Sequence, residues 1–207
     1  MTASTTGCPP SHRGFFPRHA YCGRLAIFAR MTTPAAAKAV FLDRDGVLNA
    51  EIGHYVWRLD EFRVLPEVPA ALQRLHAAGY RLIVVTNQAG IAKGLYTRAD
   101  MDACHQKLQQ ACGGLIDAFY FAPGHPSVSE SLSRKPGSLM LEKALARFRL
   151  DPARCWLVGD RARDLEAAHR VGVRAILVGP EETLAYEPRT ANLATAADLI
   201  LAAEQPG

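Results

Sequence analysis

The segment Phe41-Leu42-Asp43-Arg44-Asp45-Gly46-Val47-Leu48-Asn49 governs the interpretation of this chain, and it continues an apolar run that begins at Ala39. A short apolar run that contains a β-branched and an aromatic residue and stops at a charge is typical of a buried strand in a parallel sheet. Asp43 would then lie at the carboxyl end of that strand, where open α/β sheets bind their ligands. We therefore expect a ligand site at Asp43.

Asp43 and Asp45, separated by one residue, suit phosphoryl transfer. An aspartate at the first position can attack a phosphoryl group and form an aspartyl phosphate. Asp45 would protonate the leaving oxygen and then accept a proton from the hydrolytic water. Because an anion attacks an anion, a divalent cation and a basic side chain must accompany the pair. The alternative is that Asp-x-Asp-Gly forms only a surface turn, since Asp and Gly are common in turns.

Composition limits the class of protein. The chain has 207 residues and a formal net charge of +4, which suits one well-packed domain with a tail. Residues 1–37 contain four arginines and no acidic residue, so basic and acidic side chains balance in the remainder. This balance gives no support for a nucleic-acid surface.

The five cysteines show no zinc spacing and suit reduced thiols. No apolar run reaches the ~18 residues of a membrane helix. We expect a cytoplasmic, monomeric protein that binds neither nucleic acid nor membrane.

Residues 1–37 show no sustained helical or strand period. We expect them to form a disordered or extended N-terminal tail, followed by one α/β domain over residues 38–207. The acid-poor, arginine-bearing composition also fits an organelle transit peptide. Met31 is a second candidate for the translation start, and the sequence alone leaves the choice between it and Met1 open.

The remaining chain alternates strands and helices, as in a largely parallel sheet flanked by helices. We predict strands over residues 80–85, 117–121, 155–159 and 173–178, and helices from 66 to 79, from 97 to about 111, from about 139 to 148 and over 191–204. Thr97 and Asp100 predict a capping box. The spacing leaves no room for a separate cap domain, so specificity must come from loops 46–64, 87–96 and 122–137.

Other polar side chains are expected at the same edge of the sheet. Thr86 ends a strand, where its hydroxyl and the following N–H groups can hold phosphate oxygens. Lys135 would supply the basic group, as a mobile point charge that pairs with Asp43 and the phosphoryl group. Loop residues Glu51, His54 and Tyr55 are candidates for substrate contact, with ordinary loop packing as the alternative.

Asp160 ends the predicted strand 155–159 and is the candidate metal ligand. Together with the Asp43 carboxylate and the Asp45 backbone carbonyl it offers the hard oxygen ligands that Mg²⁺ prefers. Asp164 lies one helical turn further on. It could join the metal site or cap and orient the following helix, and we leave both open.

Asp43-x-Asp45, Thr86, Lys135 and Gly159-Asp160 occur in the order typical of the haloacid dehalogenase superfamily. The segments F-L-D-R-D-G-V-L-N, T-N-Q-A-G-I-A-K-G and R-K-P-G resemble those of its D-glycero-D-manno-heptose 1,7-bisphosphate 7-phosphatases and of the related histidinol phosphatases. The resemblance covers residues 39 to about 180. It implies a Rossmann-like α/β fold without a separate cap domain.

The resemblance also implies roles. Asp43 would be the nucleophile and Asp45 the acid/base, Thr86 and Lys135 would stabilise the phosphoryl group, and Asp160 would bind Mg²⁺. Further substrate contacts would come from Asn87, Gln88, Arg134 and Arg161, the last standing where the family often has Lys. The implied reaction is Mg²⁺-dependent hydrolysis of a sugar phosphate in heptose metabolism, at the 7-phosphate of the heptose bisphosphate. Histidinol phosphate is the alternative substrate, and a non-catalytic phosphate-binding protein on the same fold is a second alternative.

Many members of that family hold a structural zinc ion with a Cys-x-His pair and a Cys-x-Cys pair in the loop before Arg-Lys-Pro. The matching positions here are Ala122, Gly124, Ser131 and Ser133. None of these is a zinc ligand, since zinc sites use thiolate, imidazole or carboxylate. We therefore expect no zinc, and we interpret the neighbouring His125 as a loop or substrate contact.

Overall fold

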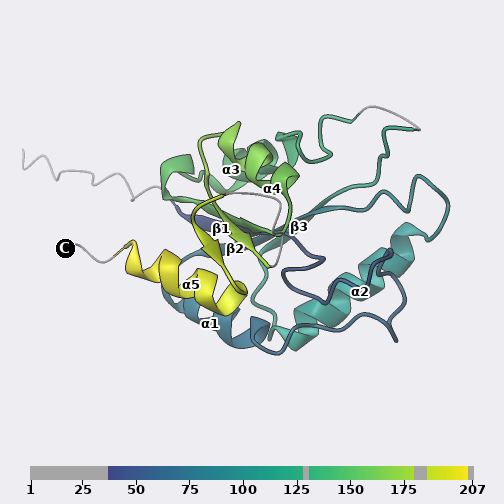
Figure 1. Cartoon of the computed structure of the whole chain (residues 1–207), viewed down its shortest axis with the longest axis horizontal. Helices are drawn as coiled ribbons and strands as arrows, with labels where there is room; N and C mark the ends of the chain where they lie inside the picture. The colour runs from purple at the N-terminus through teal and green to yellow at the C-terminus, as the bar shows by residue number, and fades with distance from the viewer. Residues whose placement is uncertain (1–36, 128–130, 180–185, 205–207) are drawn as a thin grey trace, which may run out of the picture. The chain divides into compact units, whose positions relative to one another are not determined.

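The computed structural model describes residues 37–127, 131–179 and 186–204 (Figure 1). They belong to one compact unit that spans residues 34–207. Apart from Ala37, which pairs with Leu150, the predicted tail and the question of Met1 or Met31 lie outside the described residues. No helix in the described ranges is long and apolar enough to cross a membrane.

Six parallel strands form one sheet in the order β3-β2-β1-β4-β5-β6. The strands are β1 Ala39–Leu42, β2 Arg81–Asn87, β3 Ala118–Ala122, β4 Trp156–Gly159, β5 Arg174–Val178 and β6 Arg189–Thr190. The predicted parallel α/β fold is thereby confirmed. Strand β6 was not predicted because two residues show no period. Since β1 lies between β2 and β4, the carboxyl ends of these three strands are neighbours.

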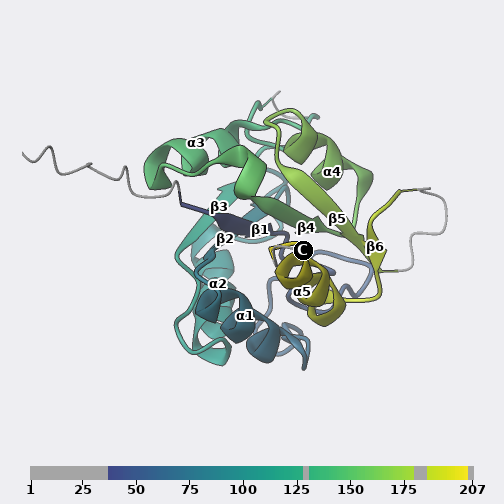
Figure 2. The same ribbon diagram turned by 90° about the vertical axis from the view of Figure 1, so that its left-hand side faces the viewer.

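Helices cover both faces of the sheet (Figures 1 and 2). On one face lie α1 Val68–Ala77, α2 Arg98–Ala111 and α5 Leu193–Ala202, and on the other lie α3 Leu139–Phe148 and α4 Ala162–His169. A short 3-10 helix, Pro152–Arg154, precedes β4. Among the described residues, the chain between Asp43 and Lys135 forms only α1, β2, α2, β3 and loops. The expected absence of a separate cap domain therefore holds over those residues.

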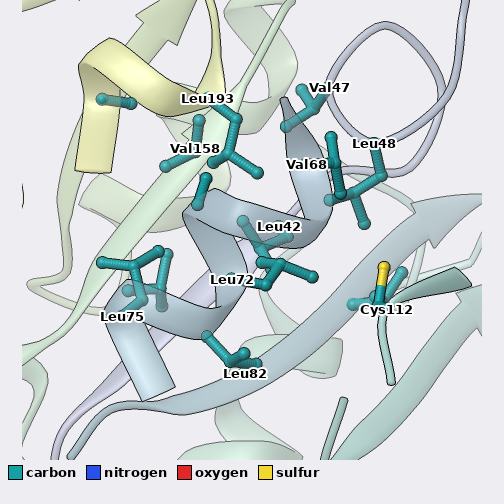
Figure 3. Packing of buried hydrophobic residues seen from close by; sticks show 14 of the residues in the cluster. Leu42, Val47, Leu48, Val68, Leu72, Leu75, Leu82, Cys112, Val158 and Leu193 are labelled. Atoms are coloured by element: carbon teal, nitrogen blue, oxygen red, sulfur yellow. The ribbon is translucent and has the colours of Figure 1, made fainter. Parts of the chain in front are cut away.

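Alternate strand residues enter two separate hydrophobic cores, because successive side chains of a strand point to opposite faces. Val40 and Leu42 of β1 pack in the core beneath α1 and α5, whereas Ala39 and Phe41 pack beneath α3 and α4. Figure 3 shows part of the first core, which contains Leu42 together with Leu72, Leu75, Leu82, Val158 and Leu193. Burial on both faces explains why β1 is a continuous apolar run that stops only at Asp43.

Local sequence signals fix where the helices begin. The predicted capping box precedes α2: Asp100 N donates to Thr97 Oγ1 at 3.2 Å, and Thr97 N donates to Asp100 Oδ2 at 2.8 Å. Helix α1 begins at Val68 with Pro69 in its first turn, where a missing N–H is tolerated. These helix positions set the two loops, 46–64 and 87–96, that leave β1 and β2 toward the site.

Candidate active site

The predicted site residues come together at the carboxyl ends of β1, β2 and β4. Asp43 directly follows β1 and donates its backbone N–H to Val158 O of β4 at 3.0 Å. Thr86 lies near the end of β2, and Asp160 directly follows β4. Parallel strands end at one edge of a sheet, so short side chains placed there converge without long loops.

Three carboxylates form the centre of the site. Asp43, Asp160 and Asp164 each offer an oxygen, and these oxygens lie within 4.8 Å of one another. Burial, together with the charges of Asp43 and Asp164, raises the pKa of Asp160 to about 7. Burial also raises the pKa of Asp164 to about 6, although Lys135 opposes that rise. Such carboxylates repel one another unless a cation lies among them, and an all-oxygen donor set fits Mg²⁺.

Lys135 is the cation that already lies in this cluster. Its Nζ is 2.9 Å from Asp43 Oδ1 and 2.6 Å from Asp164 Oδ1, and it donates to Val85 O at 2.7 Å. Burial alone would lower the pKa of Lys135, but Asp164 and Asp43 outweigh it and raise the pKa above its usual value. The predicted mobility of Lys135 is therefore wrong: the ammonium is fully buried and held by three oxygen atoms.

Asp164 serves the helix and the site together, which the sequence left as alternatives. Its Oδ2 accepts from the Arg161 backbone N–H at 3.1 Å and caps α4, while Oδ1 pairs with Lys135. Gly159 permits this arrangement, since a Cβ there would lie 2.4 Å from the Asp164 Cβ. A fully buried carboxylate with two fixed partners acts as a structural support for Lys135.

Asp45 stands beside this cluster, and side chains hold both of its carboxylate oxygens. Arg44 Nη2 donates to Oδ1 and Oδ2 at 2.9 and 3.1 Å, and Arg44 Nε donates to Oδ1 at 3.2 Å. Asn49 Nδ2 donates to Oδ1 at 3.0 Å and Gln88 Nε2 to Oδ2 at 3.2 Å. The sequence did not single out Arg44 or Asn49, although both lie within the segment that marked the site.

Asn87 and Gln88 were predicted as substrate contacts, but their amides bond within the protein. The Asn87 side chain donates to Lys135 O and accepts from Lys135 N, both at 3.0 Å. Gln88 donates to Thr86 Oγ1 at 2.9 Å and accepts from Tyr96 Oη at 2.6 Å. The amides therefore orient Lys135, Thr86 and Asp45, and burial raises the Tyr96 pKa to about 12, so that its hydroxyl stays a donor.

A cavity of about 460 Å³ opens beside Asp160. It is lined by Gly46, Asn49, Ala50, Glu51, Leu65, Asp160, Arg161 and Val178. Arg161 Nε lies 3.1 Å from Asp160 Oδ2, and Glu51 is exposed with its carboxylate accepting from Gly53 N at 2.9 Å. Two of the predicted substrate-contact residues thus border the cavity, within reach of a molecule bound at the carboxylates.

Basic side chains gather on the loops that follow β2 and β3. Burial and the charges of Lys93 and Arg134 lower the pKa of His125, and burial and the charge of Arg163 lower the pKa of Arg134. Lys93 Nζ also lies 5.4 Å from the ring of Tyr55, a predicted contact residue. His54, in contrast, is exposed and lies 3.7 Å from Glu61. Lys93, His125 and Arg134 together form a basic group that can contact an anionic part of a substrate.

The loop before Lys135 carries the four positions that were compared with zinc ligands. Ala122 is buried at the end of β3, and Gly124 O accepts from Arg134 Nη1 at 3.4 Å. Ser131 Oγ and Ser133 Oγ form a hydrogen bond of 2.7 Å. The absence of zinc stays a prediction, and residues 128–130 lie outside the described residues.

Comparisons with known proteins show the family of this chain. The profile of the haloacid dehalogenase-like hydrolases matches residues 10–172. A D-glycero-beta-D-manno-heptose-1,7-bisphosphate 7-phosphatase from Haemophilus ducreyi is 36% identical over 174 residues, covering 79% of this chain and 92% of that protein. A D-glycero-D-manno-heptose-1,7-bisphosphate 7-phosphatase from Thermosynechococcus vestitus is 38% identical over 153 residues, covering 68% of this chain and 78% of that protein.

A solved structure shares the fold. The crystal structure of D,D-heptose 1,7-bisphosphate phosphatase from B. bronchiseptica, complexed with magnesium and phosphate, superposes with a TM-score of 0.74 at 31% identity. The match covers 80% of this chain and 99% of that one. Sequence and fold therefore agree on one family.

Proposed function

Because the chain belongs to the haloacid dehalogenase-like hydrolases, we propose that it hydrolyses a phosphate monoester through an aspartyl phosphate formed on Asp43. The observation that carries this proposal is the pairing of Lys135 with Asp43 and Asp164 beside Asp160. This cluster combines a nucleophile, a fixed cation and oxygen ligands for a metal ion, which phosphoryl transfer from an anionic ester requires.

Asp43, Asp160 and the Asp45 backbone carbonyl are the groups we propose to hold Mg²⁺. When bound, the ion would offset the repulsion between the attacking carboxylate and the phosphoryl oxygens. The oxygen donors and the raised pKa of Asp160 support this fit, because a divalent cation relieves the repulsion that raises it. The presence of magnesium in the B. bronchiseptica relative supports it as well.

The residues then act in a definite order. Asp43 attacks phosphorus while the bond to the leaving oxygen breaks, and Asp45 gives that oxygen a proton. Asp45 next takes a proton from the water that attacks the aspartyl phosphate, which releases inorganic phosphate and restores Asp43. Lys135 and the Thr86 hydroxyl stabilise charge on the phosphoryl oxygens throughout.

For the substrate we propose the 7-phosphate of D-glycero-D-manno-heptose 1,7-bisphosphate. Two observations support this choice: the two curated relatives described above carry that activity in their names, and basic side chains lie near the site on the loops after β2 and β3. Lys93 and Arg134 are close enough for their charges to lower the pKa of His125. We propose that Arg134 meets the phosphate that is not transferred.

The test is a panel of phosphate esters assayed with Mg²⁺ and with EDTA. We expect turnover of the heptose bisphosphate above that of histidinol phosphate and simple sugar phosphates, and loss of turnover in EDTA. Asp43→Asn should abolish turnover, because an amide is a poor nucleophile. A preference for histidinol phosphate would replace the substrate assignment, and a wild-type protein that turns over no ester would refute the proposed reaction.

A further inference from the structure

Arg44 lies at the centre of the contacts that hold Asp45, and it has no place in the reaction described above. We propose that Arg44 is a positioning residue that fixes the Asp45 carboxylate for its proton transfers. This inference rests on the proposed phosphatase function. It concerns the Arg44 side chain, which acts on the reaction through Asp45, whereas the Arg44 backbone N–H donates to Asp43 Oδ1 at 2.7 Å.

The geometry is that of a guanidinium fork on a carboxylate. Arg44 reaches both Asp45 oxygens through Nη2, at 2.9 and 3.1 Å, and reaches Oδ1 again through Nε at 3.2 Å. The remaining donors, Asn49 and Gln88, make one bond each. The planar fork of Arg44 holds both oxygens through one rigid group, whereas Asn49 and Gln88 each reach one oxygen through a separate side chain.

Arg44 and Asp45 differ in how far their side chains are buried, and this difference suits the proposed role. The Arg44 side chain is 1% exposed, whereas that of Asp45 is 25% exposed. A guanidinium is costly to bury unless it is paired, so the charge of Arg44 is tied to Asp45. The fork therefore holds the carboxylate from the protein interior and leaves its outer side toward the solvent, from which a substrate arrives.

Arg44 also anchors the loop over residues 46–64. Its Nη2 donates to Val56 O at 2.8 Å, and its Cζ lies 5.5 Å from the centroid of the Phe62 ring. A role in loop structure alone is therefore the competing explanation. Lys107 of α2 offers a matched comparison, because its Nζ donates to Leu59 O and Phe62 O at 2.7 and 2.8 Å without contact to Asp45.

The two explanations differ in how the effect depends on the leaving group. Protonation by Asp45 matters for an alkyl alcohol, which is a poor leaving group, and matters little for p-nitrophenol, which leaves as an anion. Loss of carboxylate positioning should thus lower kcat/KM for the sugar phosphate more than kcat/KM for p-nitrophenyl phosphate. A loosened loop, which helps to recognise the sugar, should instead raise KM for the sugar phosphate and leave kcat nearly unchanged.

The experiment compares kcat/KM for the sugar phosphate and for p-nitrophenyl phosphate in Arg44→Met and Lys107→Met. We expect Arg44→Met to lower kcat/KM for the sugar phosphate ~10-fold or more beyond its effect on p-nitrophenyl phosphate. Lys107→Met should show the loop's effect alone, as a higher KM for the sugar phosphate with kcat nearly unchanged, whereas Arg44→Met should lower kcat for that substrate as well. Arg44→Lys keeps the buried charge without the fork, so it should fold and show the same selective loss in smaller degree.

A double variant tests whether Arg44 acts through Asp45. In an Asp45→Asn background, Arg44→Met should change kcat/KM for the sugar phosphate less than ~2-fold, because coupled residues are not additive. Equal losses on both esters in Arg44→Met and Arg44→Lys, or a full extra loss in the double variant, would overturn the proposal. Failure of the proposed function is distinguishable, since wild-type protein would then hydrolyse neither ester.

Discussion

The Lys135 ammonium lies 2.6 Å from Asp164 Oδ1, closer than the 2.9 Å that separates it from Asp43 Oδ1. In the proposed reaction Asp43 becomes an acyl phosphate, a mixed anhydride, and its carboxylate charge is lost from that position. Asp164 and Val85 O would still hold Lys135 in place at that stage. The cation can then face the phosphoryl oxygens without moving, which is how preorganised charge assists phosphoryl transfer.

Lys135→Met should destabilise the protein as well as abolish turnover. It leaves the two buried carboxylates of Asp43 and Asp164 without their cation, and removal of one partner from a buried ion pair costs ~3–5 kcal/mol. Unfolding titrations in EDTA should show this loss in the free energy of unfolding. On addition of Mg²⁺, Lys135→Met should gain more stability than wild type does. The exposed Lys143 of α3 provides the control Lys143→Met. Unchanged stability of Lys135→Met in EDTA would contradict the assigned ion pairs.

Arg134→Ala should weaken substrate recognition and leave the chemical step nearly unchanged. If Arg134 meets the phosphate that is not transferred, its loss should raise KM for the heptose bisphosphate and leave kcat nearly unchanged. A small monophosphate lacks that group and should be turned over almost as well as by wild type. Steady-state kinetics with both substrates make the comparison, and equal effects on the two would remove Arg134 from that role.

The pH dependence of stability should contain a contribution from His105. Its side chain is 6% exposed and stacks on Phe119 with ring centroids 4.6 Å apart. Burial, together with the charge of Arg44, lowers its pKa to about 3. The unfolded chain takes up a proton near pH 6.5 and the folded chain does not, so stability is complete above pH 6.5 and is lost as the pH falls toward 3.

His105→Gln should therefore flatten the stability profile on the acid side. Between pH 7 and pH 5 the histidine accounts for a loss of ~2 kcal/mol in the free energy of unfolding, which urea titrations at the two pH values can measure. His76→Gln, at an exposed position of α1, is the control and should retain the wild-type profile. The same loss in wild type and His105→Gln would show that carboxylates alone set the dependence.

Purified protein should contain no stoichiometric zinc. Ala122, Gly124, Ser131 and Ser133 offer no ligand of the kinds that zinc uses, and Ser131 and Ser133 bond one another instead. Elemental analysis of protein purified without chelator should show this, and zinc chelators should leave the melting temperature unchanged. One tightly bound zinc ion per chain would require other ligands and a new alignment of residues 122–133.

The sequence predicted the sheet well because buried parallel strands are short apolar runs, and each run of at least four residues was recognised. It also located Asp43, Thr86 and Asp160, since polar residues that end such runs lie at one edge of a sheet. It did not predict the burial of Lys135, which depends on Asp164 and Val85 from distant segments. Nor did it reveal Arg44, because an arginine beside two aspartates is usually exposed. Its burial depends on Val56 and Phe62 of the returning loop.

Gly46, which follows Asp45, lies so close to Asp160 that only glycine fits at this position. Its φ is +83°, and a Cβ there would lie 2.5 Å from Asp160 Oδ2. Gly46→Ala should therefore displace the Asp160 carboxylate, weaken binding of Mg²⁺ and lower turnover. Calorimetric titration of Mg²⁺ and the Mg²⁺ dependence of kcat/KM would measure both effects.

Gly53→Ala provides a matched control in the same loop. Gly53 has a φ of +82°, but a Cβ there would have no atom within 4 Å. Both substitutions strain the backbone by a comparable ~1 kcal/mol or more, so a difference between them reports the place of Gly46 at the metal site, against Asp160 and next to Asp45. We expect Gly53→Ala to lose some stability and keep wild-type affinity for Mg²⁺, while Gly46→Ala loses both. If the two variants bind Mg²⁺ equally well, the position of the Asp160 carboxylate does not govern the metal site, and Asp160 loses its proposed role as a ligand.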